Sequence, residues 1–335
     1  MNRHFVRTNT SFELQPLSKV ACRWRGDYMF LHRSFLFIFS FLFFATSIQT
    51  ASADSSSPLL AAFYDRQMAI INGVAYAWED QDTLTPVAND AIQVGVGRSA
   101  FYVLNSSNEL YRYEDNFQQS ALLMNGIAKF AAGRTGILAT KADGSLWLIA
   151  SSSKQSAKIA DNVDTAAVGD SANYYITKSG ALFVKGKAHR GQYGDGKLTA
   201  TDQFVQTASQ VAQITAHTGH AILLNKKGDV LGTGGNIFGP VGKHGLGDKA
   251  IKWSKIMGGV RAIATGSSHS VAISQDNTLF AWGSEYGVEP VAIMKEVQAV
   301  AAGSSTTIAL TLDGKLWQWE RGEKPQPKRL PSRQQ

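Results

Sequence analysis

The chain has 335 residues, of which 44% are hydrophobic and 18% charged, with a formal net charge of +7 and one cysteine, Cys22. This length can bury a sizeable core, and a single cysteine excludes an intramolecular disulfide or a zinc site built from several thiolates. Residues 1–53 hold six of the 33 Lys and Arg residues and two of the 26 Asp and Glu residues, so residues 54–335 carry a net charge of only +3. So small a charge gives no electrostatic case for binding nucleic acid.

The N-terminal part contains a pattern typical of a secretory signal peptide. From Met29, a short basic region precedes the apolar run 35–45, and the small residues Ala-Ser-Ala at 51–53 follow as a cleavage site. This three-part pattern predicts export, and the apolar run is shorter than the roughly 20 residues that span a bilayer. We therefore expect residues 29–53 to be cleaved off. Retention as a membrane anchor is the alternative.

Residues 1–28 show no apolar periodicity. We interpret them as an upstream extension ahead of the true initiator Met29, or as a disordered segment. Residues 54–335 are then the mature domain. A leader of this kind is typical of a bacterial periplasmic or extracellular protein, and we expect no membrane span after cleavage.

The mature part contains seven copies of one sequence unit. Each copy has an anchor position, held by a small residue in six copies and by His217 in the other, then a turn residue eleven positions later and a large apolar residue three positions after that. Neighbouring anchors are 35 to 37 residues apart, except for spacings of 48 and 49 on either side of the fifth anchor. The anchors are Ala62, Gly97, Gly133, Gly169, His217, Gly266 and Gly303.

Each unit has the pattern of short strands joined by tight turns. Ser270–Ser274 and Thr307–Thr311 carry polar residues at both ends and apolar residues between them, which we interpret as half-buried strands. Pairs such as Asp143-Gly144 supply the positive φ that a tight hairpin needs. About 36 residues accommodate four short strands, which is one blade of a propeller. The sequence therefore predicts an all-β, seven-bladed β-propeller.

The chain ends predict how the ring closes. The last unit continues through strands near Thr306–Leu312 and Lys315–Glu320 to Pro325–Leu330, without a small-apolar strand after them. The mature N-terminus supplies such a strand in Pro58–Ala62. We expect this N-terminal strand to complete the seventh blade and so to close the ring.

The repeat also resembles a known family. The residues that carry the resemblance best are Gly266, His269, Ser270, Ala272, Phe280, Trp282 and Gly283. They resemble the RCC1 (regulator of chromosome condensation) repeat family, in the compact form of its secreted bacterial members, and the resemblance implies a propeller. Residues 189–196 (HRGQYGDG) are similar to the GQLGxG loop of that family. Five of the seven units lack this loop, and most lack the histidine.

No motif supports catalysis, a cofactor or a metal. Residues 191–197 match GxxxxGK, but Leu198 stands where a phosphate loop needs Ser or Thr, and no helix pattern follows. His217 and His220 have an odd offset, which places their side chains on opposite faces of a strand. His220 and His269 share one repeat position, for which we expect a structural role.

The two long units predict a binding surface. Their extra loops should adjoin on the face that carries the anchor turns, because units four and five are neighbours in the ring. Aromatic residues and arginine are typical of protein-binding hot spots. The alternative is that these are ordinary blade loops of the family. The candidate partner-binding residues are His189, Arg190, Gln192, Tyr193, Asn236, Phe238, Lys243, His244 and Trp253.

We therefore expect an exported, monomeric protein-interaction module that binds another protein, with no catalytic residues, no cofactor and no metal. One alternative is a guanine-nucleotide exchange factor acting on a small GTPase, which the family resemblance implies. Another is a binding protein like the β-lactamase inhibitors built on this propeller. A hydrolase or lyase of the propeller type would need acidic residues converging on the channel, and the sequence shows no such pattern.

Overall fold

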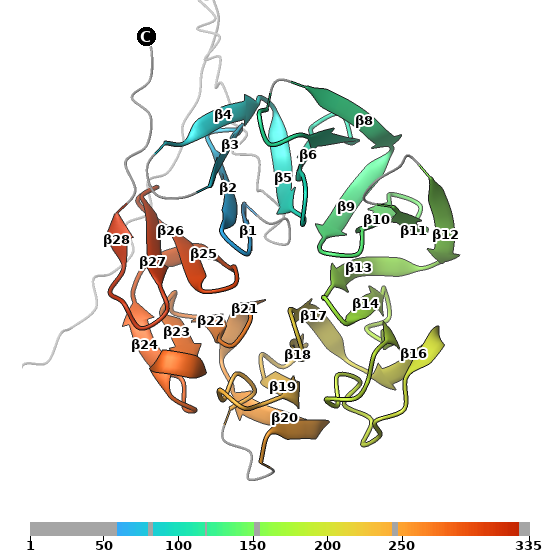
Figure 1. Cartoon of the computed structure of the whole chain (residues 1–335), viewed down its shortest axis with the longest axis vertical. Coiled ribbons are helices and arrows are strands. Elements are labelled where there is room, and N and C mark those ends of the chain that lie inside the picture. The colour runs from blue at the N-terminus through green and yellow to red at the C-terminus, as the bar shows by residue number, and fades with distance from the viewer. Residues whose placement is uncertain (1–58, 80–82, 118, 151–154, 243–246, 328–335) are drawn as a thin grey trace, which may run out of the picture. The chain divides into compact units, whose positions relative to one another are not determined.

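The computed structural model describes residues 59–79, 83–117, 119–150, 155–242 and 247–327. These residues form seven four-stranded antiparallel sheets that radiate around a common axis (Figure 1). The predicted all-β, seven-bladed propeller is therefore confirmed. The predicted signal peptide at 29–53 and the extension at 1–28 lie outside the described residues.

Each blade consists of four strands that follow one another in the chain, with the first strand innermost. Blades 1 and 2 contain β1 (Leu60–Phe63), β2 (Arg66–Ile71), β3 (Val74–Glu79), β4 (Thr85–Ala88), β5 (Ala91–Val96), β6 (Phe101–Asn105), β7 (Glu109–Tyr113) and β8 (Ser120–Asn125). Blades 3 and 4 contain β9 (Ile127–Ala132), β10 (Ile137–Lys141), β11 (Leu146–Ile149), β12 (Ser156–Ala160), β13 (Val163–Val168), β14 (Ala172–Thr177), β15 (Leu182–Gly186) and β16 (Thr201–Ala208).

The remaining three blades continue the same order. Blades 5 and 6 contain β17 (Val211–Ala216), β18 (His220–Asn225), β19 (Val230–Gly235), β20 (Lys249–Met257), β21 (Val260–Thr265), β22 (Ser270–Ser274), β23 (Leu279–Trp282), the 3-10 helix η1 (Ser284–Tyr286) and β24 (Val291–Met294). Blade 7 contains β25 (Val297–Ala302), β26 (Thr306–Thr311), β27 (Leu316–Glu320) and β28 (Gln326–Pro327).

The anchor glycines stand where neighbouring inner strands approach each other closely. A Cβ on Gly266 would lie 2.5 Å from the carbonyl oxygen of Gly303, and one on Gly303 would lie 2.5 Å from that of Tyr64. Backbone atoms cannot yield to such a contact without moving a whole blade. Glycine therefore recurs at the anchor position because a side chain there would overlap the next blade. The regular interval between these glycines makes the repeat visible in the sequence.

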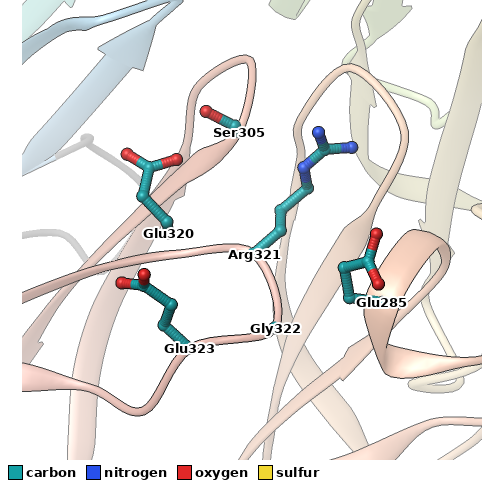
Figure 2. A pocket seen from close by; sticks show the side chains of 6 residues that line it. All are labelled: Glu285, Ser305, Glu320, Arg321, Gly322 and Glu323. Atoms are coloured by element: carbon teal, nitrogen blue, oxygen red, sulfur yellow. The ribbon is translucent and has the colours of Figure 1, made fainter.

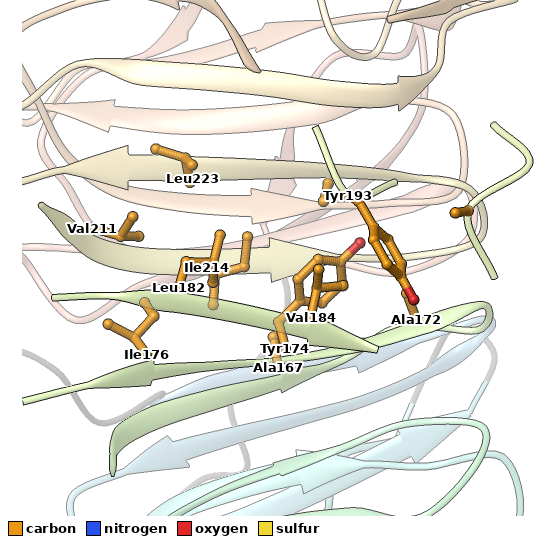
Figure 3. Packing of buried hydrophobic residues seen from close by; sticks show 12 residues of the cluster. Ala167, Ala172, Tyr174, Ile176, Leu182, Val184, Tyr193, Val211, Ile214 and Leu223 are labelled. Carbon is orange, nitrogen blue, oxygen red and sulfur yellow. The ribbon is translucent and has the colours of Figure 1, made fainter. Parts of the chain in front are cut away.

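The core lies between the blades. Tyr174, Leu182 and Val184 of blade 4 pack against Ile214 and Leu223 of blade 5, as Figure 3 shows. Full burial of each such side chain contributes roughly 1.5–3 kcal/mol. Because every blade buries one sheet face against the next, the whole ring is stabilised by these inter-blade clusters.

The ring closes differently from the prediction in one respect. The N-terminal strand β1 pairs with β2 inside blade 1, and β25 supplies the inner strand of blade 7. The prediction that Pro58–Ala62 completes the seventh blade is therefore wrong. A repeat pattern has no intrinsic starting point, and in the structure each blade begins with its small-apolar strand instead of ending with it.

Closure occurs by packing between the first and last blades. Leu60 of β1 and Trp78 of β3 share a buried cluster with Ile308 and Leu316 of blade 7. The Trp78 indole donates a buried hydrogen bond of 2.8 Å to the side-chain oxygen of Gln318. The N-terminal strand therefore does lie at the closure, but as a neighbour of blade 7.

Candidate functional site

One face of the propeller carries both the anchor turns and the loops that join the third and fourth strand of each blade. Backbone hydrogen bonds link the two sets, from Lys187 N to Ser171 O at 2.8 Å and from Gly235 N to Gly219 O at 2.9 Å. We call this the anchor face. It carries the two long loops, after β15 and after β19, from which most of the candidate partner-binding residues come.

Two candidates in the blade 4 loop are turned inward. Tyr193 is only 1% exposed, its hydroxyl donates to the carbonyl of Gly186 at 2.8 Å, and it accepts from the Thr201 amide at 3.1 Å. Burial raises the pKa of this phenol. The side-chain oxygen of Gln192 accepts from the Arg190 amide at 2.9 Å. Both side chains therefore hold the loop together.

The same loop also covers blade 5. The Thr233 hydroxyl of β19 donates to the carbonyl of Gly191 at 2.8 Å. Gly194 lies against the ring of Trp253, so close that a Cβ there would be 2.5 Å from the indole nitrogen. Trp253 packs at the edge of the cluster between blades 4 and 5. The blade 4 loop, which follows β15, thus holds blades 4 and 5 together. We call a loop that holds two blades together in this way a clasp.

The blade 5 loop repeats this arrangement one blade further on. Asn236 accepts from the Val241 amide at 3.1 Å and donates to the carbonyl of Gly242 at 3.1 Å. The carbonyl of Pro240 accepts from the buried indole of Trp282 in blade 6 at 2.8 Å. Asn236, another candidate, therefore stabilises the conformation of the loop. Through Pro240 the loop contacts blade 6, so it is the second clasp.

Three apolar side chains remain exposed where the second clasp meets blade 6. Ile237 is 64% exposed, Phe238 59% and Val288 43%. Val288 lies against Gly239, the residue after Phe238, so the three side chains belong to one region of the anchor face. We call Ile237, Phe238 and Val288 the apolar rim. Only Phe238 was among the residues selected from the sequence.

Of the four remaining candidates, two are exposed and two lie outside the described residues. His189 and Arg190 are exposed, and the Arg190 side chain extends over Gly219 of blade 5. Lys243 and His244 lie outside the described residues. The partner-binding role of the whole set stays a prediction.

The central channel contains a cavity of about 430 Å³, lined by the inner strands of all seven blades. At the end away from the anchor face, Lys129 forms an ion pair of 3.0 Å with Asp164. At the same end, on blade 6, the Arg261 guanidinium donates to the Asn277 side chain at 3.0 Å and to the carbonyl of Val297 at 2.7 Å. These three charged side chains therefore already have polar partners within the protein.

At the anchor face the channel is narrowed by a contact between distant blades. The ring of Phe63 from blade 1 stacks on His217 of blade 5, with centroids 5.6 Å apart, and Tyr64 lies 6.0 Å from the same imidazole. Burial lowers the pKa of His217, and the charge of Asp170 opposes that shift. His217 is the anchor that replaces glycine, and here it faces the channel.

Asp170 of blade 4 completes this cluster. The Tyr64 hydroxyl lies 3.4 Å from one carboxylate oxygen, and the Arg134 guanidinium lies 4.0 Å from the same oxygen. The other oxygen is buried without a hydrogen-bond partner, as is Nε2 of His217. The sequence pattern gave no sign of this cluster apart from the unusual histidine.

The two histidines at the shared repeat position are structural, as predicted. His220 Nε2 lies 3.2 Å from the Ser270 hydroxyl, and His269 Nε2 lies 3.0 Å from the Thr307 hydroxyl. Each bond joins one blade to the next. Burial lowers the pKa of both imidazoles to about 3.

A second hollow, of about 440 Å³, lies on the anchor face beside η1 and is lined by charged residues (Figure 2). Arg321 stands between Glu285 and the pair Glu320 and Glu323, and it donates to the Ser284 hydroxyl at 3.1 Å. Within the described part of the chain, no group of three or more His, Cys, Asp or Glu residues is placed to hold a metal ion. No helix there is long and apolar enough to cross a membrane.

The family model described as "Regulator of chromosome condensation (RCC1) repeat" matches residues 260–286. This stretch begins at β21 and ends at η1, so it covers most of blade 6.

Similar curated proteins match only in part. An X-linked retinitis pigmentosa GTPase regulator homolog of Caenorhabditis elegans is 30% identical over 36% of this chain and 9% of its own length. A secretion-regulating guanine nucleotide exchange factor of Bos taurus is 31% identical over 32% of this chain and 25% of its own length. The chain therefore spans a small fraction of these relatives.

Among solved structures, Prp20p of Saccharomyces cerevisiae superposes with a TM-score of 0.66 at 16% identity, covering 75% of this chain and 81% of that one. That protein was described for its binding to Gsp1p and histones. At this identity the superposition establishes the shared fold.

Proposed function

The chain belongs to the RCC1 repeat family, and from that premise we propose that it is an exported protein-binding propeller without catalytic activity of its own. The observation that carries the proposal is the apolar rim. Ile237, Phe238 and Val288 are exposed together at loops that the clasp contacts hold in place. Apolar side chains on a rigid support lose little entropy on binding, which favours a protein partner.

Nearby charges give the surface a polar border. Arg190 lies exposed over the neighbouring clasp, and His189 precedes it. Protein interfaces combine an apolar centre with a polar surround and are enriched in aromatic residues and arginine. We propose that the partner contacts the apolar rim first and Arg190 at its edge.

Affinity capture with the purified protein tests this function. The double variant Ile237→Ser/Phe238→Ser should lose a specific partner, whereas Leu312→Ser should retain it. Leu312 is a matched control because it is 57% exposed but lies in the turn between β26 and β27, on the opposite face. Equal capture by all three proteins would place the interface elsewhere.

Export is a separate part of the proposal, supported by the signal-peptide pattern at 29–53. The mass of the protein recovered from the medium or periplasm should correspond to a start near residue 54. A mass that includes residues 29–53 would support the anchored alternative.

Exchange activity remains a second candidate, because part of the chain is similar to part of an exchange factor. If the captured partner is a small GTPase, release of labelled GDP in the presence of the propeller measures that activity directly.

A further inference from the structure

The anchor-face end of the channel contains two polar atoms that have no partner. Oδ1 of Asp170 and Nε2 of His217 are both buried without a hydrogen bond. The Asp170 side chain is 7% exposed and His217 is 6% exposed, and both residues line the cavity of about 430 Å³. A buried polar group without a partner costs about 1–3 kcal/mol, so such groups call for a ligand or an ordered water.

The chemistry of these two atoms selects a hydrogen-bond donor. A carboxylate oxygen only accepts hydrogen bonds. Nδ1 of His217 lies 2.9 Å from the Thr218 hydroxyl. When Nδ1 of the neutral ring donates in that contact, Nε2 is left as an acceptor. A ligand that satisfies both atoms therefore carries at least two donors on one group.

The surroundings favour a positive charge on that group. Asp170 supplies a buried negative charge, whose second oxygen is contacted by Tyr64 and lies 4.0 Å from the half-exposed Arg134 guanidinium. Its first oxygen is left for the ligand. The rings of Phe63 and Tyr64 flank His217, and aromatic faces attract cations. An anion would instead be repelled by the carboxylate.

Behind this cluster the cavity is lined by small apolar side chains, including Ala131, Ala166 and Ala264 of three different inner strands. Its volume lies within the range of about 300–1,000 Å³ that is typical of small-molecule sites. We propose that the channel binds a small organic amine, whose ammonium group bonds to Asp170 and His217 while its apolar part lies between the inner strands.

Two variants and one control test this site. Asp170→Asn removes the charge, and His217→Gly restores the glycine found at five of the six other anchors. Asp164→Asn is the matched control, because Asp164 also lines the cavity but is paired with Lys129 at its other end. Thermal unfolding of each variant shows that it is folded. If Asp170→Asn does not fold, the loss of binding is measured on His217→Gly alone.

The probe is pentylamine, titrated by calorimetry alongside 1-pentanol and pentanoate. We expect millimolar binding of the amine alone. Because charge-assisted hydrogen bonds contribute about 1.5–3 kcal/mol, Asp170→Asn should weaken binding about tenfold or more. His217→Gly should weaken it less, and Asp164→Asn should leave it unchanged. Equal binding of 1-pentanol, unchanged binding by Asp170→Asn, or no binding of pentylamine to the wild type would each overturn the proposal. None of these results depends on the apolar rim.

Discussion

The imidazole of His269 in blade 6 contacts the hydroxyl of Thr307 in blade 7 at 3.0 Å, with both side chains fully buried. His220 of blade 5 makes the corresponding contact with Ser270 of blade 6 at 3.2 Å. The propeller thus uses uncharged histidines to hold blades 5, 6 and 7 together.

Stability should fall as the pH decreases from about 6.5 towards 3. Burial lowers the folded-state pKa of His220 and His269 from 6.5 to about 3, so between these values the unfolded chain binds protons that the folded chain does not. Each histidine then costs about 1 kcal/mol of stability per pH unit. Urea unfolding at pH 7 and pH 5 measures this loss. His269→Gln should reduce the pH dependence, and equal unfolding midpoints at the two pH values would contradict this prediction.

Gly266→Ala should destabilise the fold by about 1–3 kcal/mol, because the new methyl group would overlap the buried ring of His269 and the carbonyl of Gly303 in the next blade. Gly258→Ala is the control, since a Cβ there meets only the side-chain ends of Asp229 and Lys255. Thermal unfolding compares the two variants. Equal losses would show that the anchor position has no special spatial restriction.

Tyr193→Phe should cost about 1–3 kcal/mol and leave partner binding unchanged, because its hydroxyl holds the clasp internally through Gly186 and Thr201. Tyr111→Phe, which removes a partly exposed bond to Glu109, should cost little. Unfolding and capture are measured on the same preparations. Loss of the partner without loss of stability would restore Tyr193 as a contact residue.

Gln318→Leu should weaken ring closure by about 1–3 kcal/mol, since it leaves the buried indole N–H of Trp78 without an acceptor. Gln298→Leu is the control, because Gln298 is exposed on β25, the inner strand of the same blade. Urea titration monitored by tryptophan fluorescence gives both values. No difference between the variants would mean that the first and last blades are held by apolar packing alone.

The blades could be predicted from the sequence because their strands and turns are local. The apolar run inside Ser270–Ser274 and the positive φ of Asn277 reflect geometry within a few residues, although this strand is buried at four of its five positions instead of half-buried. The starting point of the unit could not be predicted, since any cut of a repeat gives the same period. The pairing of β1 with β2 therefore appeared only in the structure.

The candidate site was harder to predict because residue type does not fix side-chain direction in a loop. Tyr193 has hot-spot character, but the loop turns it inward. Ile237, next to Phe238, is similarly exposed, and its residue type alone does not distinguish an exposed position from a buried one. The contact between Tyr64 and Asp170 joins residues 106 positions apart, and no local pattern encodes it.

Binding of another protein by the apolar rim on the anchor face is tested most directly by hydrogen–deuterium exchange of the propeller with and without its captured partner. We predict slower exchange in residues 236–242 and 284–290 on binding, with no change in the turns of the opposite face. Protection confined to the turn around Leu312, with unchanged exchange at Phe238, would show that the apolar rim is not the interface.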